Sequence, residues 1–247
     1  AISAWLDRNS SLPTYPVPQV LPSVVLGSYD PLLDWALRQS ACGLATYFGG
    51  SNDGLDRFQR GEGVATGLHL HDYSANAWNR PFVAQRFATR PVVLVMWARR
   101  QRGLAIAERL ANRISRIADV KGHRVVAHMA GSTSRRMFEK ELANAGVSPG
   151  AVDFVGPAQS DIDGAVSVAE GKADAAYCLQ SVARQYRLPF LPMIEEHYDI
   201  LVSRRQWFEP PMQKLIRFCR DPAFAAYAAG LAGYDVAGLG GVLFNGA

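Results

Sequence analysis

The feature that most constrains this chain is a repeated local pattern, in which an apolar strand runs through a tight turn of small polar residues into an amphipathic helix. The pattern is clearest over residues 125–142, which open with three apolar residues of the kind that fill a buried strand. A turn of glycine and hydroxyl residues follows at 131–134, and Met137, Phe138 and Leu142 then recur at helical spacing. This order of elements predicts an α/β fold.

The same pattern occurs in two series along the chain. The first series covers 24–37, 44–60 and 64–72, and the second covers 124–145 and 152–178. Alternating strands and helices form parallel sheets, and the ligands of such sheets lie beyond the carboxyl ends of the strands. We therefore predict two similar lobes, each a mainly parallel sheet flanked by helices, with a ligand cleft between them.

The lobe boundaries are predicted from the apolar runs between the two series. Residues 91–97 suit one buried strand, and two further short strands are predicted at 190–194 and 198–202. We place 23–97 together with 203–247 in the first lobe, and 98–202 in the second.

Residues 1–22 differ in character from both lobes. A short helix over 1–9 would carry Ile2, Trp5 and Leu6 on one side, and a polar, proline-rich linker follows it. A linker indicates another folded unit on its far side. A helix that packs its tryptophan on the main body explains the same residues.

Small polar residues stand where the predicted strands end and the helices begin. The first backbone N–H groups of a helix have no partner within the helix, so these positions favour an anion. The competing interpretation is that Ser132 or Thr133 only caps its helix, and that Tyr177 is a core residue. The residues predicted to bind a ligand are Ser28, Tyr29, Asp30, Ser51, Asn52, His69, Ser132, Thr133, Ser134, Arg135 and Tyr177.

Charge and composition limit the classes of partner. A hydrophobic content of 49% is typical of a folded globular protein, and a net charge of +4 with Arg-rich clusters suits an anionic ligand or weak contact with nucleic acid. No apolar stretch reaches the roughly 18 residues of a membrane-spanning helix, so no membrane partner is predicted. Three widely spaced cysteines without a CxxC pair, and no secretory signal in the sequence, predict a cytoplasmic location.

No sequence motif indicates catalysis, and we predict no catalytic residue, no resident metal and no cofactor. The G-x-S-x-G and G-x-x-x-x-G-K patterns are missing. A serine within hydrogen-bonding distance of a histidine in the cleft would favour an enzyme instead. His69, His71 and Asp72 are a weaker alternative, a metal site, because three ligands so close on one strand rarely reach tetrahedral geometry.

Six blocks of the sequence, in order, resemble the type II periplasmic-binding-protein fold. More narrowly, the chain is similar to the substrate-binding domain that follows an excisionase-like or molybdate-regulator-like DNA-binding domain in bacterial transcription regulators. Residues 1–9 resemble the last helix of such an excisionase-like DNA-binding domain. The blocks are GSYDPLLDWAL at 27–37, 49–72, 90–107, AGSTSRRMFEKELANAGV at 130–147, SVAEGKADAAY at 167–177 and 188–202.

The resemblance implies a ligand-sensing effector domain for a small anion, such as molybdate or tungstate, which contacts DNA only through a separate domain. His128 and Thr133 stand where relatives usually have an arginine and a glycine, which weakens the case for a divalent oxyanion. Two alternatives stay open, an extracytoplasmic solute-binding protein of an ABC transporter and an enzyme on the same fold. Whether the chain forms a homodimer is left open.

Overall fold

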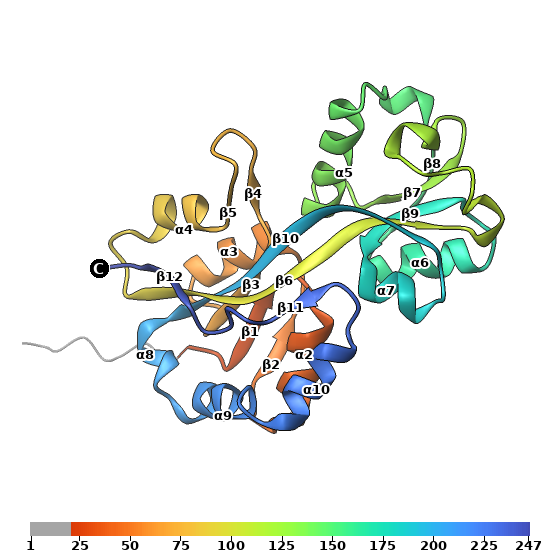
Figure 1. Cartoon of the computed structure of the whole chain (residues 1–247). Coiled ribbons are helices and arrows are strands. Elements are labelled where there is room, and N and C mark those ends of the chain that lie inside the picture. Colours follow the sequence, from red (N-terminus) through yellow and green to blue (C-terminus); the bar gives the residue numbers. More distant parts are fainter. Residues whose placement is uncertain (1–20) are drawn as a thin grey trace, which may run out of the picture.

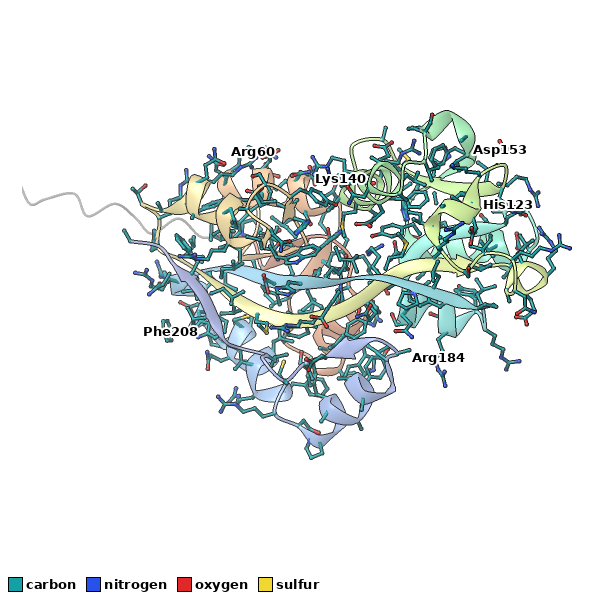
Figure 2. The ribbon with its side chains drawn as sticks, turned by 45° about the horizontal axis from the view of Figure 1, so that its top comes forward. Arg60, His123, Lys140, Asp153, Arg184 and Phe208 are labelled. Carbon is teal, nitrogen blue, oxygen red and sulfur yellow. The ribbon has the colours of Figure 1, made fainter. Side chains whose placement is uncertain are left out.

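Two lobes, joined by two long strands, make up the computed structural model, which describes residues 21–247 (Figure 1). The predicted N-terminal helix and nearly all of the predicted linker, within 1–22, lie outside the described residues. Figure 2 shows Arg60 and Phe208 at the outside of the first lobe, and Asp153 and Arg184 at the outside of the second. The predicted two-lobed α/β architecture is confirmed.

The first lobe is built on a sheet in the order β2-β1-β3-β10-β6. Strand β1 pairs in parallel with β2 and β3, whereas β10 runs antiparallel to β3. The strands that belong to this lobe alone are β1 (Val24–Gly27), β2 (Ala45–Tyr47), β3 (Ala65–Leu68), β11 (Tyr234–Asp235) and β12 (Val242–Asn245), besides a hairpin of β4 (His71–Asp72) and β5 (Ala77–Trp78). Its helices are α2 (Pro31–Gln39), α3 (Ser51–Gln59), α4 (Arg80–Phe87), α8 (Arg204–Trp207), α9 (Pro210–Phe218) and α10 (Pro222–Gly230).

The second lobe repeats the arrangement, with the order β8-β7-β9-β6-β10. Strand β7 pairs in parallel with β8 and β9, and β6 runs antiparallel to β9. Its own strands are β7 (Arg124–His128), β8 (Asp153–Ala158) and β9 (Ala175–Leu179). Its helices are α5 (Thr133–Asn144), α6 (Asp161–Ala169) and α7 (Gln180–Gln185), with 3₁₀ turns at Glu108–Leu110, Ile117–Val120 and Pro149–Ala151.

Strands β6 (Val92–Ile106) and β10 (Phe190–Ser203) run through both lobes. They pair antiparallel along nearly their whole length, with register shifts near Pro192 and Tyr198. The sequence predicted one short strand at 91–97 and two at 190–194 and 198–202. This prediction of three short strands was wrong. Strands β6 and β10 hydrogen-bond to each other along the polar segment between the lobes, so each continues as one long strand. Residues 199–202, placed in the second lobe by the predicted boundary, pair with β3 in the first.

Each lobe has its own apolar core. One cluster, with Leu33, Ile200 and Phe224, lies in the first lobe, and another, with Phe138 and Leu142 of α5, lies in the second. Separate cores are what two lobes with a cleft between them require. Within residues 21–247, no helix has the length and apolar character needed to cross a membrane.

Candidate functional site

A cleft of about 230 Å³ lies between the lobes, and both lobes line it. The second lobe supplies residues 128–129 at the end of β7, 132–134 at the start of α5, 159–161 at the start of α6, and Leu179 and Val182 near α7. Arg102 reaches the cleft from β6. The first lobe supplies Ser28, Tyr29, Phe48, Gly49, Gly50 and His69.

The start of α5 faces this cleft. The hydroxyl oxygen of Ser132 accepts the backbone N–H of Arg135 at 3.1 Å, which is the predicted cap. Within the described residues no hydrogen bond involves the backbone N–H of Thr133 or Ser134, as expected for the first turn of a helix. Capping and anion binding are therefore compatible here, because the cap uses only one of the donors.

The start of α3 faces the cleft from the opposite lobe. Its N-cap, Gly50, has a φ of +101° and no side chain, so the backbone approaches the cleft closely. Ser51, the first helical residue, is buried beneath it, and its hydroxyl contacts the Ser28 hydroxyl at 2.8 Å. Two helix starts, one from each lobe, thus meet at one cleft.

Ser51 also contacts His69, the arrangement that would favour an enzyme. The Ser51 hydroxyl lies 3.2 Å from His69 Nδ1 and accepts the His69 backbone N–H at 3.0 Å. Burial lowers the pKa of His69 to about 3, so its imidazole is a weak base, and Ser51 is only 1% exposed. The contact holds His69 in place, and the pair lacks the basicity and the exposure of an activated serine–histidine pair.

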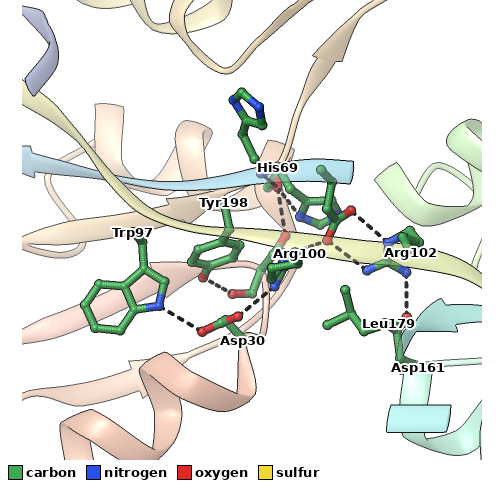
Figure 3. A network of polar contacts seen from close by, with 12 residues as sticks. Asp30, His69, Trp97, Arg100, Arg102, Asp161, Leu179 and Tyr198 are labelled. Atoms are coloured by element: carbon green, nitrogen blue, oxygen red, sulfur yellow. Dashed lines mark hydrogen bonds and ion pairs between the residues drawn. The ribbon is translucent and has the colours of Figure 1, made fainter. Parts of the chain in front are cut away.

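A chain of buried ion pairs lies below the cleft and spans both lobes, and its members Arg102 and Asp161 line the cleft (Figure 3). Arg100 donates to Asp30 at 2.8 Å and also pairs with Glu196. Glu196 in turn accepts from Arg102 Nε at 2.8 Å, and Arg102 donates to Asp161 at 3.0 Å. The network therefore links the start of α2 in one lobe to the start of α6 in the other.

The charges in this network stay on at neutral pH. Burial raises the pKa of Glu196, but Arg100 and Arg102 outweigh it and bring the pKa to about 2. The pKa of Asp161 is also lowered, since attraction to Arg102 exceeds the effect of burial. Three carboxylates, including that of Asp30, stand against two guanidinium groups, so the network provides no spare positive charge.

Five of the predicted ligand residues do not line the cleft, and one of them, Ser51, lies beneath it. Asp30 is consumed by local contacts, because it caps α2 through Leu33 N–H at 2.6 Å and accepts from Trp97 Nε1 at 3.0 Å. Asn52 follows Ser51 in the first turn of α3, outside the lining residues. The remaining two, Arg135 and Tyr177, are turned toward protein.

Arg135 pairs with Glu139 on its own helix at 2.5 Å and lies over the Phe154 ring at 4.3 Å. Tyr177 is fully buried and stacks on Phe138, with ring centroids 5.2 Å apart. It serves the core, as the competing interpretation held. Ser51 is beneath the cleft, and the other six predicted residues, Ser28, Tyr29, His69, Ser132, Thr133 and Ser134, line it.

The lining also contains residues that were not predicted from the sequence, among them Phe48, Arg102, Gln159, Asp161 and Leu179. Arg102 belongs to a cluster of arginines that is usually solvated. In β6 the odd and even positions face opposite ways, so Arg100 and Arg102 point inward while the Arg99 side chain stays 43% exposed. The sequence signal for Arg102 was the alternation of inward and outward positions along residues 99–102 of a strand.

No metal site accompanies the cleft among residues 21–247, where no three His, Cys, Asp or Glu side chains are placed to share an ion. His69 follows β3, whereas His71 belongs to the β4–β5 hairpin, where its ring centroid lies 4.5 Å from that of Trp78. His128 donates from Nε2 to the Tyr177 carbonyl at 2.7 Å, because a carbonyl oxygen can only accept.

This fold and cleft define a class of two-lobed binding proteins, and the sequence profile of the PBP superfamily domain matches residues 35–220. The chain belongs to the PBP superfamily. Among curated proteins, it is 28% identical over 205 residues to the uncharacterized protein YvgK of Bacillus subtilis strain 168. The match covers 82% of this chain but 66% of YvgK, slightly less than two thirds of its length.

Solved structures share the fold at low sequence identity. The effector binding domain of QuiR in complex with shikimate has a TM-score of 0.57 at 10% identity, covering 79% of this chain and 93% of that domain. The ancestral amino acid-binding protein AncCDT-1, a precursor of cyclohexadienyl dehydratase, also scores 0.57, at 14% identity over 84% and 93%. PhnD1 from Prochlorococcus marinus, in complex with methylphosphonate, scores 0.56 at 14% identity over 88% and 93%.

Proposed function

We propose that this chain is the ligand-sensing domain of a bacterial transcription regulator and that it holds a small anion in the cleft. The observation that carries the proposal is the meeting of two helix starts, those of α3 and α5, from opposite lobes at one cleft. Their free N–H groups and partial positive charge suit an anion. The kinship with an effector binding domain supports a sensing role.

The proposed mechanism is a shift between open and closed arrangements of the lobes. A ligand that contacts α3 and α5 together binds the closed arrangement better, so it raises the closed population. The two strands between the lobes, β6 and β10, transmit the change from the open to the closed arrangement. In this proposal the protein is cytoplasmic, and contact with DNA comes from a segment outside this chain.

The first experiment is calorimetric titration of the purified domain with molybdate, tungstate, sulfate and small carboxylates. The oxyanions are included because the family resemblance implies them, and carboxylates because His128 stands in place of an arginine. We expect at least one anion to bind with a stoichiometry near one. A folded domain that gives no binding heat with any of these anions would refute the proposal.

A pair of variants tests whether backbone N–H groups bind the anion. Thr133 is the first residue of α5 and follows an extended Ser132, so proline is tolerated there but removes the N–H donor. Thr133→Val is the matched control, because it loses only the hydroxyl. We expect Thr133→Pro to bind the anion at least tenfold more weakly than Thr133→Val, since a charge-assisted hydrogen bond contributes about 1.5–3 kcal/mol. Equal affinities would contradict this role.

The regulator and transporter versions of the proposal make different predictions. The alternative is an extracytoplasmic solute-binding protein of an ABC transporter. The coding sequence upstream of Ala1 distinguishes them, because a winged helix-turn-helix there supports the regulator and a secretory leader supports the receptor. In a gel-shift assay we expect no sequence-selective DNA binding by this domain alone, and tight selective binding would contradict that expectation.

A further inference from the structure

Two buried polar atoms in the cleft lack a hydrogen-bond partner within residues 21–247, namely Nε2 of His69 and Oγ1 of Thr133. His69 follows β3 in the first lobe, Thr133 opens α5 in the second, and both line the cleft. They are only 6% and 7% exposed, so water satisfies them poorly. Because unpartnered buried polar atoms cost stability, this pair points to a ligand that supplies both partners.

His69 offers that ligand a hydrogen bond without a charge. Its Nδ1 is engaged by Ser51 at 3.2 Å, which leaves Nε2 as the free ring nitrogen. Burial lowers its pKa to about 3, so the ring is neutral across the physiological range. His69 therefore offers the ligand one hydrogen bond at Nε2 and no charge to balance a second anionic group.

The lining is partly apolar, and the cleft is roomier than a tetrahedral oxyanion needs. Tyr29 and Phe48 of the first lobe form an edge-to-face pair, with ring centroids 5.6 Å apart. Met129, Leu179 and Val182 add apolar side chains from the second lobe. The cleft volume of about 230 Å³ is many times the roughly 10–15 Å³ that holds one water molecule. A ligand with a small carbon skeleton fills this space better than a bare oxyanion does.

The charges of the cleft select against a second negative charge. The charged residues of the lining are Arg102 and Asp161, which pair with each other at 3.0 Å. Arg102 is further neutralised by Glu196 at 2.8 Å. A monoanion can be held by the N–H groups of α5, but the second charge of a dianion would face Asp161 without a cation of its own.

We infer that the ligand is a small organic monocarboxylic acid that also carries a neutral hydroxyl or oxo group. The carboxylate would lie at the start of α5 and accept from Thr133, and the neutral group would pair with His69. This inference rests on the anion-binding function proposed above and specifies the chemistry of the anion. It excludes molybdate and sulfate as the preferred ligands.

Calorimetric titration with paired acids tests the ligand class. The probes are lactate against propionate and 3-hydroxybenzoate against benzoate, with molybdate and sulfate as dianions. We expect a hydroxy acid to bind at least tenfold more tightly than its unsubstituted partner and than either dianion. Tighter binding of molybdate or sulfate would overturn this inference while leaving the anion-binding function intact. No binding of any of the six probes would refute both.

Two pairs of variants test the two assigned atoms, with the tightest-binding hydroxy acid as the probe. Thr133→Val removes Oγ1, and Thr66→Val is its control, because Thr66 has an equally buried, unpartnered hydroxyl outside the lining. His69→Asn keeps an atom at the Nδ1 position for Ser51 but deletes Nε2, whereas His69→Gln keeps an atom near Nε2.

We expect Thr133→Val and His69→Asn each to weaken binding about tenfold, and Thr66→Val to leave it unchanged. His69→Gln should retain more affinity than His69→Asn. Thermal melts confirm folding of each variant. If folded Thr133→Val and His69→Asn bind the acid as tightly as the wild type, the assignment of these two atoms is wrong.

Discussion

Replacing Glu196 by glutamine tests the ion-pair network below the cleft. Glu196 is fully buried and pairs with both Arg100 and Arg102, so the change removes the charge that the two guanidinium groups share. The new amide also presents N–H donors toward N–H donors. Because both arginines stay buried, we expect a loss of stability rather than a local rearrangement.

Two arguments give the expected loss of unfolding free energy in Glu196→Gln. Burial raises the pKa of Glu196, but Arg100 and Arg102 bring it to about 2 from the ordinary 4.5, which corresponds to about 3 kcal/mol of unfolding free energy at neutral pH. Breaking a buried ion pair by removing one partner costs about 3–5 kcal/mol. For a domain of this size, 3 kcal/mol lowers the melting temperature by roughly 6–12 °C.

The assay is unfolding by urea and heat at several pH values, with Glu195→Gln as the control. Glu195 is the neighbouring residue, but its side chain is 47% exposed and lies 3.5 Å from Arg99, so its loss should cost well under 1 kcal/mol. A carboxylate with a lowered pKa stabilises above pH 4.5 and loses this effect as the pH falls toward 2. The deficit of Glu196→Gln should shrink over the same window. Equal stability of the two variants at pH 7 would refute the reasoning.

The remaining predictions concern the crossing strand β10 and its contacts. Burial raises the pKa of Asp199 to about 7, although a 2.6 Å hydrogen bond from Asn79 has the opposite effect. The folded state therefore holds a proton that the unfolded state releases above about pH 4. The stabilisation that this proton provides is lost as the pH rises to 7. In urea unfolding at pH 8, Asp199→Asn should therefore be more stable than the wild type by up to about 4 kcal/mol, and at pH 4 it should show no gain. Gly67→Ala would place a Cβ 1.8 Å from the Tyr198 hydroxyl oxygen and break its 2.6 Å bond to the Ser28 carbonyl. We expect a loss of about 2–3 kcal/mol, and an unchanged thermal midpoint would contradict the packing described here.

Local chemistry made much of the fold predictable. Helix α5 begins where Ser132 can cap it, and α2 begins at Pro31, whose missing N–H has no partner in a first turn. The alternation of such helices with apolar strands was enough to predict two lobes and a cleft. These features depend on residues within a few positions of one another.

The crossing strands were not predictable in this way. Residues 99–102 look like a solvated cluster because their partners lie far away in the sequence, as Glu196 does from Arg100 and Arg102. Pairing of β6 with β10, β9 and β11 makes the segment a strand and brings every second arginine inside. Asp161 was not predicted in the site for the same reason, because its partner Arg102 is far away in the sequence.

Two of the predicted residues lie outside the lining for a local reason that the sequence contains. Arg135 has Glu139 four residues later on the same helix face, and such a pair competes with a ligand for the guanidinium. Asp30 precedes Pro31 at a helix start, where an aspartate is used as a cap. The hydroxyls at 132–134 had no such competitor except the single cap, and all three line the cleft.

The passage of β6 and β10 through both lobes also sets the order in which the chain can fold as it leaves the ribosome. The second lobe needs nothing beyond the first part of β10, so all its strands are present once residue 197 has been synthesised. The first lobe begins earlier but ends later, because β3 lacks its neighbour until 199–202 emerge, and β6 lacks β11 and β12 until residues 234–245 are made. During translation the edge of β3 therefore stays unpaired while the second lobe is completed, and an unpaired strand edge favours aggregation of the nascent chain.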